Sequence, residues 1–437
     1  MHLDREVLNE FLLGRLGPHE NRQVLRHLLS GCEECRRASR EVWNGAEAPA
    51  DMDLSAIASR AWKQGRAFDK ERTAAPELVA ELAKLTPEQQ LLVAHNSSRL
   101  RTRSVCELLS DEAVADCASD AELAIQRATI ATLLAARLPR GRYGTGVVND
   151  VQARAWSALG HAQRAASRLF EAEDSFARAE DLLEIGSGDA GQVGRFWYLK
   201  AILRHAQRRF EEALELYQRA AREFAADHDG HLVGSTQVDR ARTLRELGDL
   251  PGAVRSVRAG LARLDPERSP RMALVGKHNL TLYLQELGET EEATRLIAEL
   301  LPLHARLGGT IDKVRLRWLE GKIAHLQGDL DRGRAAFEEV RQAFIERSMP
   351  YDAALVSLDL AAVHLRQERF AEVLELAGEM LTVFRALAID REAIAAVYLL
   401  EQVAAARQVS LTLLAELATY LKRVREEPGL VFEPSGG

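Results

Sequence analysis

From about residue 150 onward the chain repeats itself, and this repeat limits the possible folds more than any other feature. One column of the repeat holds small residues, spaced 41 residues apart once and then 40 apart four times. The next small column follows twelve residues later, and four residues after that comes a column that is large and apolar until its last member. The three columns are Gly160, Ala201, Ala241, Thr281, Gly321 and Ala361; Ala172, Ala213, Ala253, Ala293, Gly333 and Val373; and Phe176, Tyr217, Val257, Ile297, Phe337 and Ala377.

Turn-like pairs recur in register between the first two columns, at Gly248-Asp249, Gly288-Glu289 and Gly328-Asp329. Small residues let two helices approach closely, and the large residue that follows fills the space toward the next pair of helices. A glycine between the helices supplies the turn. The pattern therefore predicts a stack of helical hairpins.

Two segments show the family resemblance of these repeats, Gly321-Lys-Ile-Ala-His-Leu-Gln-Gly-Asp-Leu330 and Arg209-Phe-Glu-Glu-Ala213. They resemble the tetratricopeptide-repeat (TPR) family, which has a small residue in helix A, Gly-Asp-aromatic at the turn, and Ala followed by an aromatic in helix B. The resemblance implies an all-α fold, a right-handed α-solenoid of TPR-like hairpins. The usual period of the family is about 34 residues, so the longer period here implies longer helices.

The chain divides into five parts by these patterns. We expect a small helical module at 1–45, a linker with helix at 46–75, and a degenerate helical start of the solenoid at 76–150. The regular TPR-like repeats occupy 151–390. Residues 391–428 have helical apolar spacing but leave the repeat columns, which is typical of C-terminal capping helices.

Composition excludes several classes of protein. The chain is 46% hydrophobic, only 5% aromatic and has a net charge of −7, so it has no global basic field and a nucleic-acid partner is not favoured. Its first residues do not have the pattern of a secretion signal, and no apolar run is long enough to span a membrane. We therefore expect a cytoplasmic, bacterial-type protein with reduced cysteines.

A candidate metal site lies near the amino terminus, where His27, Cys32 and Cys35 have the spacing His-x4-Cys-x2-Cys. Two thiolates and an imidazole from neighbouring turns can share one tetrahedral zinc ion. The fourth ligand is open between His2, which is upstream, and His19. The alternative is a small helical module that keeps its cysteines without metal.

The segment Leu13-Gly-Arg-Leu-Gly-Pro-His-Glu20, which precedes these ligands, resembles the zinc-binding anti-sigma domain of bacteria. That family ends its second helix in His-x3-Cys-x2-Cys, one residue shorter than the spacing here. The resemblance implies one structural zinc ion on His27, Cys32 and Cys35, with His2 at the place of an upstream ligand. It also implies a sigma factor as partner.

No catalytic motif stands beside these features. The chain lacks a Gly-rich phosphate loop, a Gly-x-Ser-x-Gly elbow and a His-Glu-x-x-His metal motif, so we expect no enzyme. Cys106 and Cys117 are interpreted as buried apolar cysteines. Four histidines recur near the small column of helix A and are interpreted as structural residues, namely His205, His278, His325 and His364.

The A helices of a solenoid line its concave surface, and here they are rich in Arg and Lys. Such a groove favours an acidic peptide or a peptide carboxylate through charge-assisted hydrogen bonds. The alternative is a solvated surface whose basic residues pair with nearby Glu. The predicted partner-binding residues are Arg204, Arg242, Arg245, Arg315 and Lys322.

Together these features indicate a non-enzymatic scaffold or regulator. The hypothesis is control of transcription, in which the repeats bind a protein or peptide and the amino-terminal module contacts a sigma factor. Two alternatives remain open: a peptide or ligand sensor without a sigma factor, and an adaptor for a neighbouring effector enzyme such as a protease.

Overall fold

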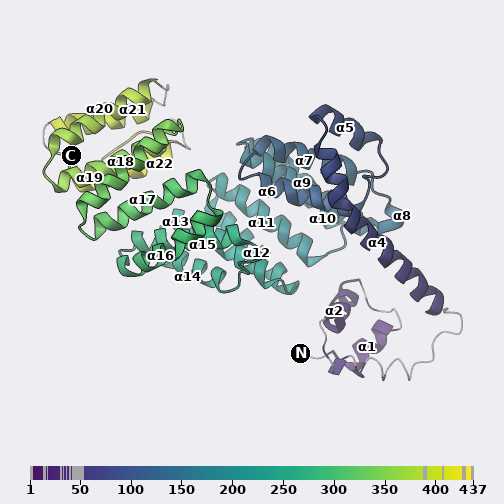
Figure 1. Ribbon diagram of the computed structural model, residues 1–437. Coiled ribbons are helices and arrows are strands. Elements are labelled where there is room, and N and C mark those ends of the chain that lie inside the picture. The colour runs from purple at the N-terminus through teal and green to yellow at the C-terminus, as the bar shows by residue number, and fades with distance from the viewer. Residues whose placement is uncertain are drawn as a thin grey trace. The chain divides into compact units, whose positions relative to one another are not determined.

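The computed structural model describes residues 3–12, 16, 18–29, 32, 34–35, 37–38, 41, 54–386, 391–405, 408–425 and 430–434. All regular secondary structure in these ranges is α-helical, and they contain no strand (Figure 1). The prediction of an all-α fold is therefore confirmed. The chain forms two compact units, Met1–Arg208 (unit 1) and Arg209–Gly437 (unit 2), each of which is described by itself.

Unit 1 begins with the short helices of the amino-terminal module, continues through one long helix, and then forms antiparallel helix pairs. Its helices are α1 (Arg5–Leu12), α2 (Pro18–Leu29), α4 (Leu54–Ala83), α5 (Pro87–Asn96), α6 (Arg103–Asp116), α7 (Ala121–Ala135), α8 (Arg140–Tyr143), α9 (Thr145–Ala165), α10 (Leu169–Glu184) and α11 (Ala190–Ala206).

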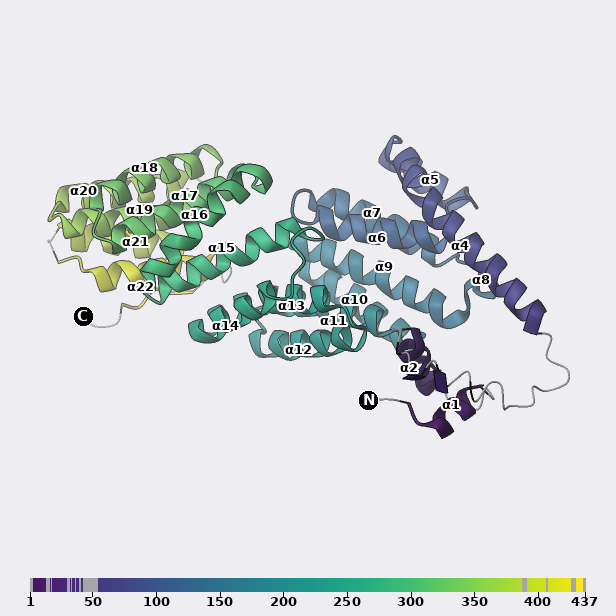
Figure 2. The same cartoon turned by 60° about the horizontal axis from the view of Figure 1, so that its bottom comes forward.

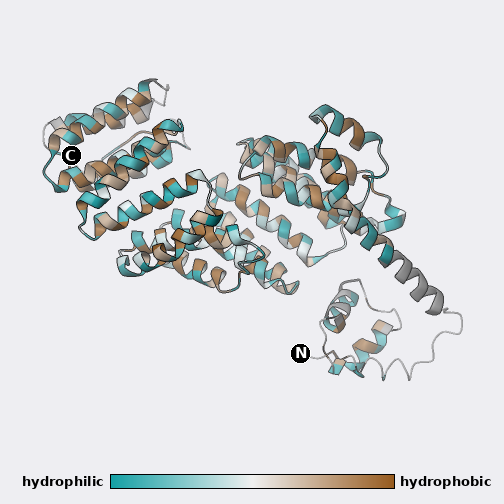
Figure 3. Cartoon of the chain, viewed as in Figure 1, coloured by the Kyte–Doolittle hydropathy of each residue, from teal (hydrophilic) through white to brown (hydrophobic). Residues whose placement is uncertain are grey.

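Unit 2 is a stack of hairpins in which each helix packs on the next along the chain. Hydrophobic residues follow one side of most helices, as the brown and teal alternation in Figure 3 shows. Its helices are α12 (Phe210–Ala226), α13 (Gly230–Glu246), α14 (Leu250–Leu261), α15 (Pro270–Glu286), α16 (Thr290–Leu307), α17 (Thr310–Leu326), α18 (Leu330–Glu346), α19 (Pro350–Arg366), α20 (Phe370–Ala386), α21 (Arg391–Ala405) and α22 (Leu411–Val424).

The small column and the large apolar column face each other within a hairpin, as the repeat predicts. A Cβ atom added to Gly321 on α17 would lie 2.8 Å from the ring of Phe337 on α18, and a Cβ on Gly160 would lie 2.8 Å from the ring of Phe176. Both phenylalanines are fully buried. The small residue therefore makes the space that the aromatic ring fills.

The turns between helix A and helix B have one backbone conformation in six successive hairpins. Three of these positions hold the glycines of the turn-like pairs, Gly248, Gly288 and Gly328, with φ of +81°, +81° and +82°. The equivalent residues in the other three hairpins adopt the same left-handed region without being glycine, and they are Ser167, Arg208 and Glu368. The next helix starts at once, because the side chain of Asp249 or Asp329 accepts a hydrogen bond from its N-terminal backbone.

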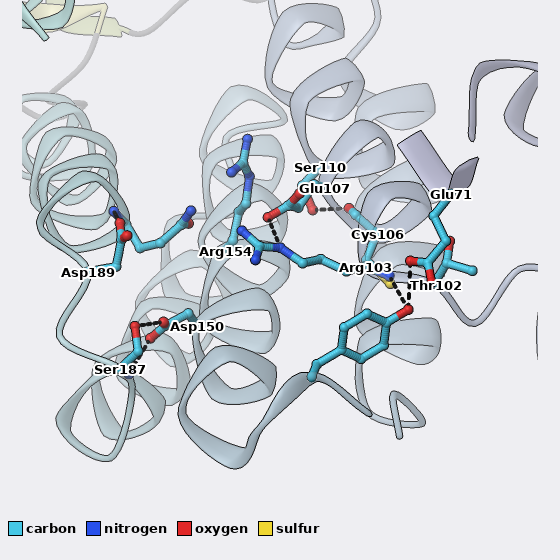
Figure 4. Close-up of polar contacts among 12 residues, drawn as sticks. Glu71, Thr102, Arg103, Cys106, Glu107, Ser110, Asp150, Arg154, Ser187 and Asp189 are labelled. Carbon is cyan, nitrogen blue, oxygen red and sulfur yellow. Dashed lines mark hydrogen bonds and ion pairs between the residues drawn. The ribbon is translucent and has the colours of Figure 1, made fainter. Parts of the chain in front are cut away.

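Helix α4 belongs to the core of unit 1 well before residue 76. Ala75 is buried with residues of α6, α7 and α9, and the ring of Phe68 stacks on Tyr143 at a centroid distance of 5.6 Å. The hydroxyl of Tyr143 donates to Glu71 at 2.8 Å, next to Arg103 (Figure 4). The expected boundary between linker and solenoid at residues 75 and 76 thus falls inside a continuous helix.

A buried carboxylate fixes one connection of unit 1. Asp150 on α9 accepts hydrogen bonds from the backbone N–H of Ser187, at 3.0 Å, and from the Ser187 hydroxyl, just before α11 (Figure 4). Burial raises the pKa of Asp150, and the two bonds from Ser187 oppose that shift. Gly186 leaves the room that this carboxylate needs, because a Cβ there would overlap it.

The last two helices of unit 2 follow different paths. Helix α21 packs on α20, as the first helix of a further hairpin does. Helix α22 instead packs mainly against α19 (Figure 1, Figure 2). The tail then returns along α22, because the Tyr420 hydroxyl donates to the Leu430 carbonyl at 2.9 Å and its ring contacts Phe432.

Candidate functional site

The residues of the predicted metal site lie together. His27 is in the last turn of α2, and its Nε2 atom is 3.2 Å from the sulfur of Cys35. The potential ligand atoms of His27, Cys32 and Cys35 all lie within 4.8 Å of one another. One imidazole and two thiols at this separation are a donor set that suits zinc.

Cys35 is the most enclosed member of this cluster, with 1% of its surface exposed. The backbone N–H of Leu3 donates to its sulfur at 3.2 Å, so the start of the chain lies beside the cluster. Burial raises the pKa of the Cys35 thiol, and the Leu3 N–H opposes that shift. His2 and the side chain of His19 lie outside the described residues, and the identity of the fourth ligand stays a prediction.

Of the five predicted partner-binding residues, Arg204 lies in unit 1 and is buried, with 7% of its surface exposed. It donates to both carboxylate oxygens of Glu173 on α10, one of them at 2.7 Å, and to the amide oxygen of Gln207 at 2.7 Å. The hydrogen bonds from Arg204 lower the pKa of Glu173 to about 2. This guanidinium already has a carboxylate partner.

Arg245 in unit 2 makes a similar bidentate pair, between consecutive A helices. Its Nε and Nη2 atoms on α13 lie 2.8 and 2.5 Å from the carboxylate oxygens of Glu286 on α15. Burial raises the pKa of Glu286, but the hydrogen bonds and the charge of Arg245 outweigh it and keep the carboxylate ionised. The pair has 24% and 23% of its side chains exposed, so it lies at the surface of the unit.

Lys322 on α17 belongs to a cluster with Trp318 and Asp359. Its ammonium lies 4.7 Å from the centre of the Trp318 ring and 3.5 Å from Asp359 on α19. The indole N–H of Trp318 donates to the same carboxylate oxygen at 2.6 Å. A cation over an indole is stabilised by the ring as well as by the carboxylate.

Arg242 and Arg315 are the two exposed members of the predicted set. Arg242 has 51% of its side chain exposed and lies 4.0 Å from a carboxylate oxygen of Asp239. Arg315 is exposed and makes no hydrogen bond or ion pair within the described ranges. Both guanidinium groups are accessible to a ligand, but whether any of the five residues binds a partner stays a prediction.

The structure adds a cation that the sequence did not single out, Lys422 on α22. Lys422 is exposed, yet desolvation lowers its pKa, and the charges of Lys322 and Arg245 lower it further while Glu286 and Asp359 oppose them. Charges on four A helices, α13, α15, α17 and α19, thus act on Lys422. We call the set around it the A-helix face, formed by Arg245, Glu286, Trp318, Lys322 and Asp359.

The remaining cysteines and histidines do not form a further metal cluster in the described ranges. Cys106 is fully buried, and burial raises the pKa of its thiol. Burial also raises the pKa of the Cys117 thiol, to about 11. Thiols of this kind are poor nucleophiles. The histidines of the small column lie on successive helices, and burial lowers the pKa of His278, His325 and His364.

Each helix in the described ranges is too short or too polar to cross a membrane.

Comparisons with known proteins identify the fold. No protein-family model matches the chain, and neither does any curated protein. Among solved structures, the Rap protein complexed with competence and sporulation factor is similar over 74% of this chain and 88% of its own, with 11% identity and a TM-score of 0.55. The apo form of RapI covers 65% of this chain and 98% of its own, with 13% identity and a TM-score of 0.48. Aspartyl phosphate phosphatase F from Bacillus subtilis covers 87% and 93%, with 14% identity and a TM-score of 0.47. The similarity to the Rap protein complex, with its TM-score above 0.5, shows that the chain has a TPR-like helical-repeat fold.

Proposed function

We propose that this chain is a non-enzymatic regulator that binds an acidic peptide, or an acidic segment of a partner protein, on the A-helix face of unit 2. One observation carries the proposal. Arg245 and Lys322 present cations there from separate A helices, with 24% and 22% of their side chains exposed, while Glu246, Glu286 and Asp359 pair with them. A carboxylate of a ligand would accept charge-assisted hydrogen bonds from these cations.

The fold supports a partner of peptide size. A helical-repeat surface presents a row of side chains from successive helices along which an extended chain can lie. The Rap protein structure that shares this fold was solved in complex with competence and sporulation factor. Exposed Arg242 and Arg315, on the same two A helices α13 and α17, supply further positive charge for a longer acidic segment.

The test is retention of labelled short peptides that contain Asp and Glu, compared with the same peptides carrying Asn and Gln, at physiological salt. We expect the acidic peptides to bind and Lys322→Glu to weaken their binding about tenfold or more, because the new carboxylate repels the ligand. Arg332→Glu, at an exposed arginine on α18, is the matched control and should bind like the wild type. Equal binding by Lys322→Glu and wild type, or no preference for acidic peptides, would remove the A-helix face as the site.

We further propose that His27, Cys32 and Cys35 hold one zinc ion, whose chemistry here is structural: it fixes the end of α2 to the segment that follows. The support is the convergence of the three ligand atoms within 4.8 Å and the position of Leu3, the residue after His2, at Cys35. By its resemblance to the zinc-binding anti-sigma domain, this module would make a second protein contact, with a sigma factor, and the chain would then control transcription.

The zinc proposal is tested by elemental analysis of protein that was purified under reducing conditions without chelators. We expect about one zinc per chain in the wild type and none in the double variant Cys32→Ser, Cys35→Ser, because a serine hydroxyl does not replace a thiolate ligand of zinc. Cys117→Ser is the matched control and should keep the metal. A wild-type protein without metal, or a double variant that retains it, contradicts the proposal.

A further inference from the structure

Helix α22 is amphipathic, as helices that bind to a protein surface are. It begins at the N-cap Ser410, whose side chain accepts a hydrogen bond from the backbone N–H of Leu413. Leu414, Leu417, Leu421 and Val424, spaced by three, four and three residues, are buried on one side, while residues such as Ala415 and Thr419 are exposed. This is the pattern of an amphipathic helix that binds in a groove by its i, i+3, i+7 positions.

Helix α22 packs on the surface of α19, an A helix three elements back in the chain. In a continuing stack, the second helix of a hairpin packs on the first, but α22 packs mainly against α19 rather than α21 (Figure 2). Arg425 donates to Asp352 at 3.1 Å from just beyond the end of α22. The negative charge of Asp359 favours the ammonium form of Lys422 and raises its pKa, against the larger effect of burial. Asp352 and Asp359 lie two turns apart on the same side of α19, so this side faces α22.

The same side of the preceding A helix is polar. Forty residues before Leu355 and Ala362 of α19, the repeat holds Arg315 and Lys322 of α17. Leu355 is buried, with 8% of its surface exposed, whereas Arg315 is exposed. At these two positions the A-helix surface changes from basic on α17 to apolar on α19, while Asp352 and Asp359 keep the same side of α19 charged.

The docked position also carries an electrostatic cost. Burial lowers the pKa of Lys422, and the charges of Lys322 and Arg245 lower it further, while the opposing carboxylates Glu286 and Asp359 are already paired with these two residues. Like charges in a partly desolvated place repel. The apolar side of α22 thus stabilises the docked helix, and its charged end destabilises it.

We propose that α22 is an intramolecular ligand of the A-helix face, which undocks from α19 as a unit and so controls access of the partner. This inference rests on the proposed function, since it regulates the same surface. An acidic segment places negative charge where α22 places Lys422, so the partner gains attraction at the point where the resident helix meets repulsion. Undocking frees the side of α19 that includes Asp352, Leu355 and Asp359.

The first test is hydrogen exchange by mass spectrometry on the full-length wild type. We expect amides of α22 to exchange at least about tenfold faster than those of α19, because local undocking needs less free energy than opening of the stack. The charge variant Lys422→Glu should slow exchange in α22 severalfold, since it replaces repulsion by attraction. Ala415→Glu, on the exposed side of α22, is the matched control and should leave the exchange unchanged. Equal protection of α19 and α22, or no effect of Lys422→Glu, overturns the proposal.

The second test adds a fluorescein-labelled synthetic peptide of residues 409–425 to the full chain. Wild type should bind it weakly, because the tethered α22 has a high effective concentration. Leu417→Ser loosens the tethered helix, and this variant should bind the peptide at least about tenfold more tightly. A folded Leu417→Ser chain that binds no better than wild type overturns the proposal, and the wild-type exchange data decide the matter if that variant does not fold. Neither test uses an acidic partner, so failure here is distinct from failure to retain acidic peptides.

Discussion

Histidine side chains lie buried between helices of the repeats. The rings of His278 and His304 are 5.6 Å apart, and Nδ1 of His278 and both ring nitrogens of His304 have no hydrogen-bond partner within the described ranges. Burial lowers the pKa of His278 to about 4, and the charges of His304 and Arg315 act in the same direction while Asp312 opposes them. At neutral pH both imidazoles are accommodated as uncharged groups.

The pH dependence follows from the lowered pKa of His278. Above its ordinary value of 6.5 the residue is neutral in both states, and its full contribution to stability is present. As the pH falls from 6.5 toward 4, the unfolded chain binds a proton that the folded chain does not, so stability is lost. For His278 alone we expect a loss of about 2 to 3 kcal/mol between pH 7 and pH 4.5, measured by urea unfolding. His278→Gln should reduce that loss, whereas His228→Asn, at an exposed position of the same unit, should not. Parallel curves for all three proteins would refute this account.

At the scale of elements, α4 runs across the expected boundary between residues 75 and 76. Pro76 lies inside this helix, and a proline usually marks a helix start or end because it lacks a backbone donor and crowds the preceding turn. The packing of Phe68, Glu71 and Ala75 on the core of unit 1 overrides that preference. Such a tertiary contact has no signature in local sequence.

This packing predicts that two truncated chains will differ in the stability of unit 1. Removal of residues 1–53 leaves α4 whole, so unit 1 should keep its thermal unfolding. Removal of residues 1–75 also deletes the ring that stacks on Tyr143 and the carboxylate that accepts from its hydroxyl, and should destabilise unit 1 by about 2 to 4 kcal/mol. Circular dichroism melts of both fragments check this, with Glu71→Gln in the full chain as a milder control. Identical melts of the two fragments would show that the contact contributes nothing.

At the scale of the whole molecule, the contacts that recur in every hairpin could be predicted from the sequence, and the contacts that occur only once could not. The hairpins, the pairing of Gly321 with Phe337 and the left-handed turns repeat one steric solution, so six copies made them visible. The convergence of His27, Cys32 and Cys35 was also predictable, because their spacing is local. The partner carboxylates of Arg245 and Lys322, and the seat of α22, occur once each and join residues far apart in sequence. The aligned positions of the repeat do not predict contacts of this kind.

The polar links between consecutive A helices have a consequence for how this protein can evolve. Arg245 with Glu286 and Trp318 with Asp359 are each 41 residues apart, and neither pair is repeated in the other hairpins. Excision of one 40-residue repeat would preserve the apolar stacking, but it would bring Leu326 to the place of Glu286 and leave Arg245 with only Glu246 of these two carboxylates. Each of these pairs therefore joins one particular hairpin to the next. The hairpins share one fold, yet these polar pairs fix their order along the chain. A lineage that gains or loses a repeat must therefore also acquire substitutions in the adjacent hairpins.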